Sequence, residues 1–175
     1  ISIGMEKSNR DLLKDKPRSK NESILNKNFL FGLGLEGLLI GMFTIIAFYA
    51  GNPMKTPLTA STMAFATLCL ARLFHGFNCR GKGSIFKLGV FSNKYVWYAF
   101  GIGLVLLNAV LFVPFLQGLF EVENLMLSQY VTIYILAFIP TLIIQFIKII
   151  NEVIENRKVK KNPSGKFENN LKNIA

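Results

Sequence analysis

The chain has 175 residues, 51% of them hydrophobic, and its mean hydropathy of +0.40 is high for a water-soluble domain with 17% charged residues. These properties coexist because the charges are gathered in a few stretches, with long apolar runs between them. A soluble helical bundle would carry polar residues every three or four positions along each helix, and these runs do not. The composition therefore excludes an ordinary soluble domain and favours an integral membrane protein.

Four apolar runs are each long enough to cross a bilayer as a helix. We expect the spans at about residues 29–50, 57–77, 95–116 and 130–150. A tight turn at Gly51-Asn52-Pro53 joins the first two. The predicted fold is an all-α membrane protein whose four transmembrane helices form two antiparallel hairpins and a partial helical bundle.

Lysine and arginine residues fall mostly on one side of these spans. Residues 1–28 contain seven, residues 78–94 contain four, and the tail from Lys148 contains seven more, whereas the turn 51–56 contains one and residues 117–129 contain none. Cytoplasmic segments of membrane proteins are enriched in these residues. The sequence therefore predicts a multi-pass protein of the cell membrane with both termini cytoplasmic. The net charge of +10 is a topology signal with some attraction to anionic lipid, and it requires no nucleic acid.

The sequence divides into three parts. Residues 1–28 are polar and are expected to form a cytoplasmic loop that precedes the first span. Residues 29–155 form the predicted four-helix transmembrane domain. Residues 156–175 are rich in Lys and Asn, and we predict a basic, disordered cytoplasmic tail there.

Two charged residues lie within the predicted spans, where a charge is costly and indicates a function by default. Glu36 and Arg72 both lie about 8–11 Å inside the cytoplasmic boundary at 1.5 Å per residue. Three interpretations remain open: an ion pair between them, an Arg72 side chain that reaches to the lipid headgroups, or an Arg72 that lines a polar pathway. His75, one turn further, is interpreted as a surface or hydrogen-bonded group in preference to a metal ligand.

Other polar and small residues in the spans favour helix packing over chemistry. Gly37 and Gly41 form a small-xxx-small pattern that permits close approach of two helix backbones. Asn108 and Gln145 are single amides that interhelical hydrogen bonds explain. The sequence shows no phosphate-binding loop, no metal-spaced Cys/His set and no nucleophile with a base, so no catalytic or metal-binding residue is assigned.

Two segments resemble the cation pumps known as P-type ATPases. The first resembles the loop after the sixth membrane helix of these pumps, and it consists of Gly4-Met5-Glu6, Asp11-Leu12-Leu13 and Lys16-Pro17-Arg18-Ser19. The second resembles the stretch from the eighth into the ninth helix of bacterial calcium-type pumps, and it consists of Ala71-Arg72-Leu73-Phe74-His75-Gly76-Phe77-Asn78-Cys79-Arg80, Ser84-Ile85-Phe86 and Phe91-Ser92-Asn93-Lys94. The order of the spans fits as well, so the resemblance covers nearly the whole chain.

The resemblance implies the C-terminal membrane region, the last four helices, of a bacterial P-type cation-transporting ATPase of the calcium-pump type. Such pumps move cations against a gradient through an aspartyl-phosphate formed from ATP, and the last four helices support the transport helices. The resemblance therefore implies no cofactor for this fragment but ATP and Mg for the parent pump. The implied partners are the remainder of the pump, membrane lipids and a transported cation, calcium in the first place.

The resemblance also implies roles for individual residues. Asp11, with Pro17 and Arg18, belongs to a coupling loop that docks on the phosphorylation domain, although Lys14 stands where the animal calcium pump has a second acid. Gly37 and Gly41 match the glycine-rich seventh helix, which packs on the fifth. Arg72 falls where the eighth helix of the two-calcium animal pump supplies a glutamate ligand. Its guanidinium would replace one cation by charge, which makes Arg72 and Glu36 neighbours of the cation site and predicts one calcium per cycle.

The D-K-T-G phosphorylation motif of such pumps does not occur in these 175 residues. We therefore expect the chain to be a fragment that is not catalytic by itself. The alternative is a stand-alone four-span scaffold or lipid-binding protein. The DNA immediately upstream of Ile1 distinguishes the two, since the pump requires an in-frame D-K-T-G motif there.

Overall fold

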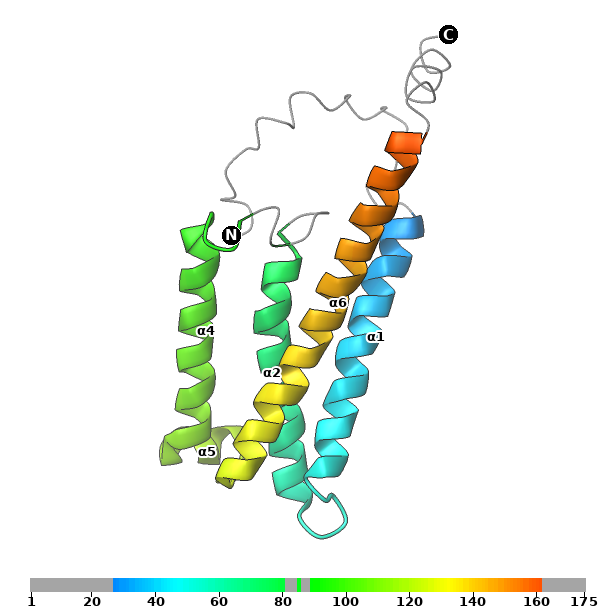
Figure 1. Cartoon of the computed structure of the whole chain (residues 1–175). Helices are drawn as coiled ribbons and strands as arrows, with labels where there is room; N and C mark the ends of the chain where they lie inside the picture. The colour runs from blue at the N-terminus through cyan, green and yellow to red at the C-terminus, as the bar shows by residue number, and fades with distance from the viewer. Residues whose placement is uncertain (1–26, 81–84, 86–88, 162–175) are drawn as a thin grey trace.

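The structure is a computed structural model that describes residues 27–80, 85 and 89–161. The predicted coupling loop and most of the predicted tail lie outside the described residues. The described helices are α1 (Lys27–Ala50), α2 (Pro57–Asn78), α4 (Lys94–Phe112), α5 (Pro114–Phe120) and α6 (Leu127–Lys161) (Figure 1). The described part of the chain contains helices, turns and loops and no strand.

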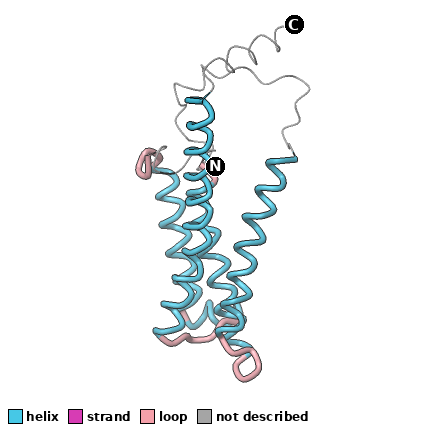
Figure 2. Tube along the Cα trace, turned by 45° about the vertical axis from the view of Figure 1, so that its right-hand side comes forward, coloured by secondary structure: helices cyan, strands magenta, loops and turns pink. Residues whose placement is uncertain are grey.

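Four of these helices are long and apolar enough to cross a membrane: Leu30–Ala50, Pro57–Asn78, Lys94–Phe112 and Leu127–Ile154. They run alternately up and down the bundle, and the connections between them gather at its two ends (Figure 2). The predicted all-α fold with four membrane-spanning helices is confirmed.

Helix α2 is the centre of the bundle, because α1, α4 and α6 all pack against it. The main contact of α4 among the long helices is with α2, whereas α1 and α6 also pack against each other. The buried core lies where these helices meet and consists of Ile40, Met63, Ala66, Leu70, Ala71, Leu107, Leu111, Ile133 and Ala137. Three of these nine side chains are alanines, which let helix backbones approach closely in a membrane bundle.

Two glycines stand at the tightest approaches between helices. A Cβ at Gly51 would meet the Cα of Ala60 in the first turns of α2, and a Cβ at Gly103 of α4 would meet a methyl group of Leu73. Backbone atoms such as those of Ala60 cannot move aside as a flexible side chain does. Gly51 therefore sets how closely the first hairpin closes.

The helix boundaries differ from the expected spans at two places. Helix α4 ends at Phe112, not at residue 116, because Pro114 disfavours a helical conformation at the residue before it. Val113 accordingly has φ −87° and ψ 116°, and Pro114 begins the short helix α5. Helix α6 contains Pro140 and continues to Lys161, so residues 156–161 are helical and not part of a disordered tail.

The loop between α2 and α4 is held together by Arg80, which is buried although it is charged. Its guanidinium donates to the carbonyl oxygens of Gly89 at 3.0 Å and Val90 at 3.4 Å and to Ser92 Oγ at 2.5 Å. Asn93 then caps α4 by accepting a hydrogen bond from the backbone N–H of Tyr95 at 2.9 Å. Arg80, one of the four basic residues between positions 78 and 94 on which the predicted topology rests, therefore also stabilises the loop.

Candidate functional site

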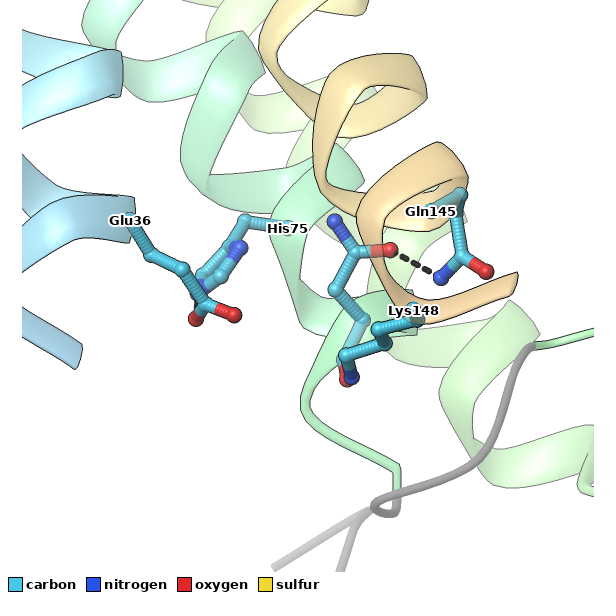
Figure 3. A network of polar contacts seen from close by, with 5 residues as sticks. Glu36, His75, Gln145 and Lys148 are labelled. Atoms are coloured by element: carbon cyan, nitrogen blue, oxygen red, sulfur yellow. Dashed lines mark hydrogen bonds and ion pairs between the residues drawn. The ribbon is translucent and has the colours of Figure 1, made fainter. Parts of the chain in front are cut away.

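Polar side chains of three helices meet near one end of the bundle, where α1 and α4 begin and α2 ends. We call this the basic end, because the Lys- and Arg-rich loop between α2 and α4 lies there. The side chains converge from α1, α2 and α6 (Figure 3). The basic-end cluster consists of Glu36, His75, Asn78, Gln145 and Lys148.

Glu36 faces His75 across the contact between α1 and α2. Glu36 Oε2 lies 3.4 Å from His75 Nε2, and the two side chains are 27% and 8% exposed. The side chains of residues 72 and 75 point in directions about 60° apart around α2, because a helix has 3.6 residues per turn. His75 is the one of the two that faces Glu36 of α1. The structure therefore shows an ion-pair contact of Glu36 with His75 and none with Arg72.

Gln145 of α6 forms hydrogen bonds with the end of α2 and with the loop that follows it. Its Nε2 donates to the side-chain oxygen of Asn78, and its Oε1 accepts a hydrogen bond from the backbone N–H of Ile85 at 3.1 Å. Lys148 Nζ donates to the backbone oxygen of Asn78 at 2.5 Å, which satisfies one of the carbonyls left open at the end of a helix. The interhelical hydrogen bond predicted for Gln145 is confirmed, and Asn108 of α4 likewise donates to Tyr134 Oη of α6 at 3.5 Å.

Two atoms of the basic-end cluster are buried without a hydrogen-bond partner among the described residues. They are His75 Nδ1 and Asn78 Nδ2, and the hydroxyls of Thr67 and Thr141 share this property deeper in the bundle. Most buried polar atoms in proteins have a partner, so such atoms require an explanation. His75 Nδ1 can either accept or donate a hydrogen bond, depending on its protonation.

Arg72 lies in a groove between α2 and α4. The groove has a volume of about 530 Å³, and its lining is otherwise apolar apart from Cys69: Phe65, Leu68 and Leu73 of α2, and Gly103, Leu106, Leu107 and Val110 of α4. The Arg72 side chain is exposed, and it forms no hydrogen bond or ion pair with the residues that the structure describes. A guanidinium in this position must reach the headgroups or be covered by other protein, because an exposed charge in the hydrocarbon is costly.

The glycines of the small-xxx-small pattern face away from the rest of the chain. A Cβ at Gly37 or Gly41 would have no other atom of the described structure within 4 Å, apart from the backbone of α1 itself. The large apolar side chains of Leu38, Met42 and Ile45 are exposed on the same helix. Any close helix packing at Gly37 and Gly41 therefore involves a partner other than α2, α4 and α6.

A second polar cluster lies at the opposite end of the bundle, and sequence reasoning did not identify it. Thr59 Oγ1 donates to Glu123 Oε2 at 2.6 Å, and the backbone N–H of Glu123 donates to Thr62 Oγ1 at 3.0 Å. Gln117 is buried beside them and donates to Asn124 Oδ1 at 2.8 Å. Two threonines three positions apart at the start of a span are the signal that could have indicated this contact.

The site residues Asp11, Pro17 and Arg18 lie outside the described residues. Within the described part of the chain, no group of three His, Cys, Asp or Glu residues is placed to hold a metal ion. The basic-end cluster brings together one carboxylate, one imidazole and one ammonium group from three helices. It also connects the loop after α2 to α6 by a hydrogen bond. Such a cluster fixes helices relative to one another and holds ionisable groups inside an apolar bundle.

Comparison with known proteins places this bundle in a family. Residues 1–150 match the model of the family described as "Cation transporting ATPase, C-terminus". The chain is 32% identical to calcium-transporting ATPase 1 of Bacillus cereus over 85% of its length, 33% identical to the calcium-transporting ATPase of Bacillus subtilis over 82%, and 39% identical to a calcium-transporting ATPase of Listeria monocytogenes over 71%. It spans 19%, 16% and 14% of those proteins, respectively. With a family match over most of its residues and four membrane-spanning helices in the expected order, the chain belongs to the family of cation-transporting ATPase C-terminal regions.

Proposed function

We propose that the chain is the transmembrane support domain of a P-type pump that uses ATP to transport calcium. The observation that carries the proposal is the family match over residues 1–150, which agrees with the four spans of the structure. The relatives named above are calcium-transporting ATPases, which favours calcium as the cation. ATP and Mg²⁺ act on the remainder of the pump in this proposal, since the phosphorylation motif does not occur in these residues.

The outer faces of the bundle support a role as part of a larger membrane assembly. Helix α1 exposes a face with Gly37 and Gly41, and we propose that a transport helix of the same pump packs there. Small residues allow backbones to approach closely where no hydrophobic force drives helices together in lipid. Other exposed apolar side chains, such as Ile102 and Leu106 of α4, face either lipid or the transport helices.

We further propose a location in the cell membrane with the basic end in the cytoplasm. The distribution of Lys and Arg supports this orientation, because cytoplasmic segments carry the excess. In this orientation residues 1–28 face the cytoplasmic domains of the pump. Asp11, Pro17 and Arg18 are then placed to couple phosphorylation to the membrane helices, as the resemblance implies.

The experiment that tests the proposal is ATP-dependent uptake of radioactive calcium into inside-out membrane vesicles. The vesicles contain the full-length protein that includes this chain, and vesicles with the 175-residue chain alone are the control. We expect uptake only with the full-length protein and Mg-ATP. Uptake of another cation in place of calcium would change the assigned ion, and the absence of any ATP-dependent uptake would support the scaffold alternative.

Arg72 is the residue that we propose to be next to the cation site, with Glu36 nearby on α1. Its exposed guanidinium, in a groove that the chain itself leaves open, supports contact with the transport helices. A fixed positive charge at that place would replace one cation and give one calcium per ATP. The test compares calcium transported per ATP in the wild type, Arg72→Glu and Arg72→Ala, with Arg72→Lys as the charge-preserving control. An unchanged ratio in all variants would instead favour a side chain that reaches the headgroups.

A further inference from the structure

The contact between Glu36 and His75 places two ionisable groups side by side within spans of a membrane bundle. Glu36 lies on α1 within the span Leu30–Ala50, and His75 lies on α2 within the span Pro57–Asn78. Ionisable residues within membrane spans are rare and indicate an ion or proton pathway by default. Histidine is the side chain whose charge ordinarily changes between pH 5 and 8.

The two nitrogens of His75 have different surroundings. Nε2 faces the carboxylate of Glu36 at 3.4 Å, so a proton on Nε2 is directed at a negative charge. Nδ1 is buried and has no partner among the described residues. Nδ1 is therefore the atom that gains or loses a proton while the contact with Glu36 is kept.

The charged groups around His75 oppose one another. The carboxylate of Glu36 on α1 has the opposite charge to an imidazolium, whereas the side chains of Arg72 on α2 and Lys148 on α6 have the same charge as an imidazolium. Cys79, one residue beyond α2, is a further titratable group near the same charges. With neutral His75 the pair carries one net negative charge, and with protonated His75 it carries none. Uptake of one proton at His75 therefore neutralises the pair, which the contact with Glu36 and the unpartnered Nδ1 both allow.

We propose that Glu36 and His75 together form a proton-binding site at the basic end, with His75 Nδ1 as the atom that takes up the proton. The proton strengthens the contact between α1 and α2, because it turns the contact of a neutral imidazole with a carboxylate into a charge-assisted ion pair. The site thus makes the packing of α1 on the bundle dependent on the pH at the basic end. The proposal rests on the described contacts and does not depend on the identity of the transported cation.

The test is nitrogen NMR of the full 175-residue chain in lipid nanodiscs, with ¹⁵N-labelled histidine and an affinity tag without histidine. His75 is the only histidine of the chain, so each imidazole signal is assigned without ambiguity. We expect the wild type to change from a neutral imidazole protonated at Nε2 to an imidazolium between pH 9 and pH 5. An imidazole that keeps one charge state over this range overturns the proposal without the use of any variant.

Two variants test the partners with opposite expected signs. Glu36→Gln should lower the ratio of imidazolium to imidazole at pH 6.5 by about tenfold, since one unit charge in contact changes a protonation equilibrium by that order. Arg72→Met should raise the same ratio. Glu123→Gln, at the opposite end of the bundle, is the matched carboxylate control and should leave it unchanged. Equal ratios in Glu36→Gln and Glu123→Gln would overturn the assignment of Glu36 as the partner.

Discussion

Gln145 and Asn78 lie 67 positions apart in the sequence, yet their side chains form a buried hydrogen bond where α6 crosses the end of α2. The same Gln145 side chain also accepts a hydrogen bond from Ile85 in the following loop. At the opposite end, Glu123 ties the connection before α6 to Thr59 of α2. Both ends of α2 are therefore fastened to α6 or its connection by polar contacts, and α2 and α6 form the most constrained pair of the bundle.

Replacement of Gln145 by Leu should destabilise the bundle by about 1–2 kcal/mol, because it leaves the Asn78 side chain and the Ile85 N–H without their partner. The free energy of unfolding is measured by circular dichroism during titration with a denaturing detergent. Thr132→Ala is the control, since the Thr132 hydroxyl bonds to the Ser128 carbonyl on its own helix, and a change below about 0.5 kcal/mol is expected. Equal stability of Gln145→Leu and wild type would contradict a structural role for Gln145.

Gly51→Ala should destabilise the chain by about 1–3 kcal/mol, because the added methyl group meets the backbone of Ala60. The same change at Gly41 meets no atom of another element and places a better helix former in α1, so no loss of stability is expected in the 175-residue chain. Thermal unfolding in detergent micelles compares the two variants. A larger loss at Gly41 than at Gly51 would mean that α1 packs through its glycine face within this chain.

Gly41→Leu should leave the isolated chain folded and reduce ATP-dependent calcium uptake by the full-length pump, if the proposed packing of a transport helix on α1 is correct. The bulky side chain would block close approach of that helix. The control is Leu38→Met, an exposed position of the same helix that keeps its apolar volume. Full transport activity of Gly41→Leu would place the partner of α1 elsewhere.

Thr59→Val should destabilise the bundle by about 1 kcal/mol, because the Glu123 carboxylate in the second polar cluster loses a hydrogen bond. The change keeps the size of the side chain, so packing is little affected. Thr44→Val is the matched control, since the Thr44 hydroxyl bonds to the Ile40 carbonyl of its own helix. The comparison uses the same detergent titration, and a larger loss for Thr44→Val would contradict the expected role of Glu123.

Cys79 offers a test of the proposed orientation. Partial burial against the bundle, together with the nearby Glu36, raises the pKa of the Cys79 thiol above its ordinary value. The reactive thiolate is therefore scarce at pH 7, and alkylation should accelerate as the pH rises above about 8.5. In the Cys69→Ser variant, a membrane-impermeant maleimide should label Cys79 in inside-out vesicles and not in right-side-out vesicles. Labelling of right-side-out vesicles alone would reverse the orientation.

The four spans and their antiparallel order could be predicted from the sequence, because a membrane-spanning helix depends on the length and polarity of one continuous segment. The break of α4 could also have been placed more accurately, since Pro114 acts on the residue directly before it. The extension of α6 beyond residue 155 is harder to predict from the sequence. A polar, basic segment is compatible with either a helix that projects from the bundle or a disordered tail.

The identity of the contacts was decided by the tertiary structure alone. Charge and depth leave an ion pair between Glu36 and Arg72 open as one interpretation of the sequence, and the structure shows His75, three residues away on α2, as the partner of Glu36. The depth of a side chain in the membrane follows from the sequence, because each residue of a helix adds a fixed rise along its axis. The direction in which a side chain points around its helix axis also follows from the sequence. Which residue it contacts depends on how α1, α4 and α6 pack around α2, and only the tertiary structure gives that packing.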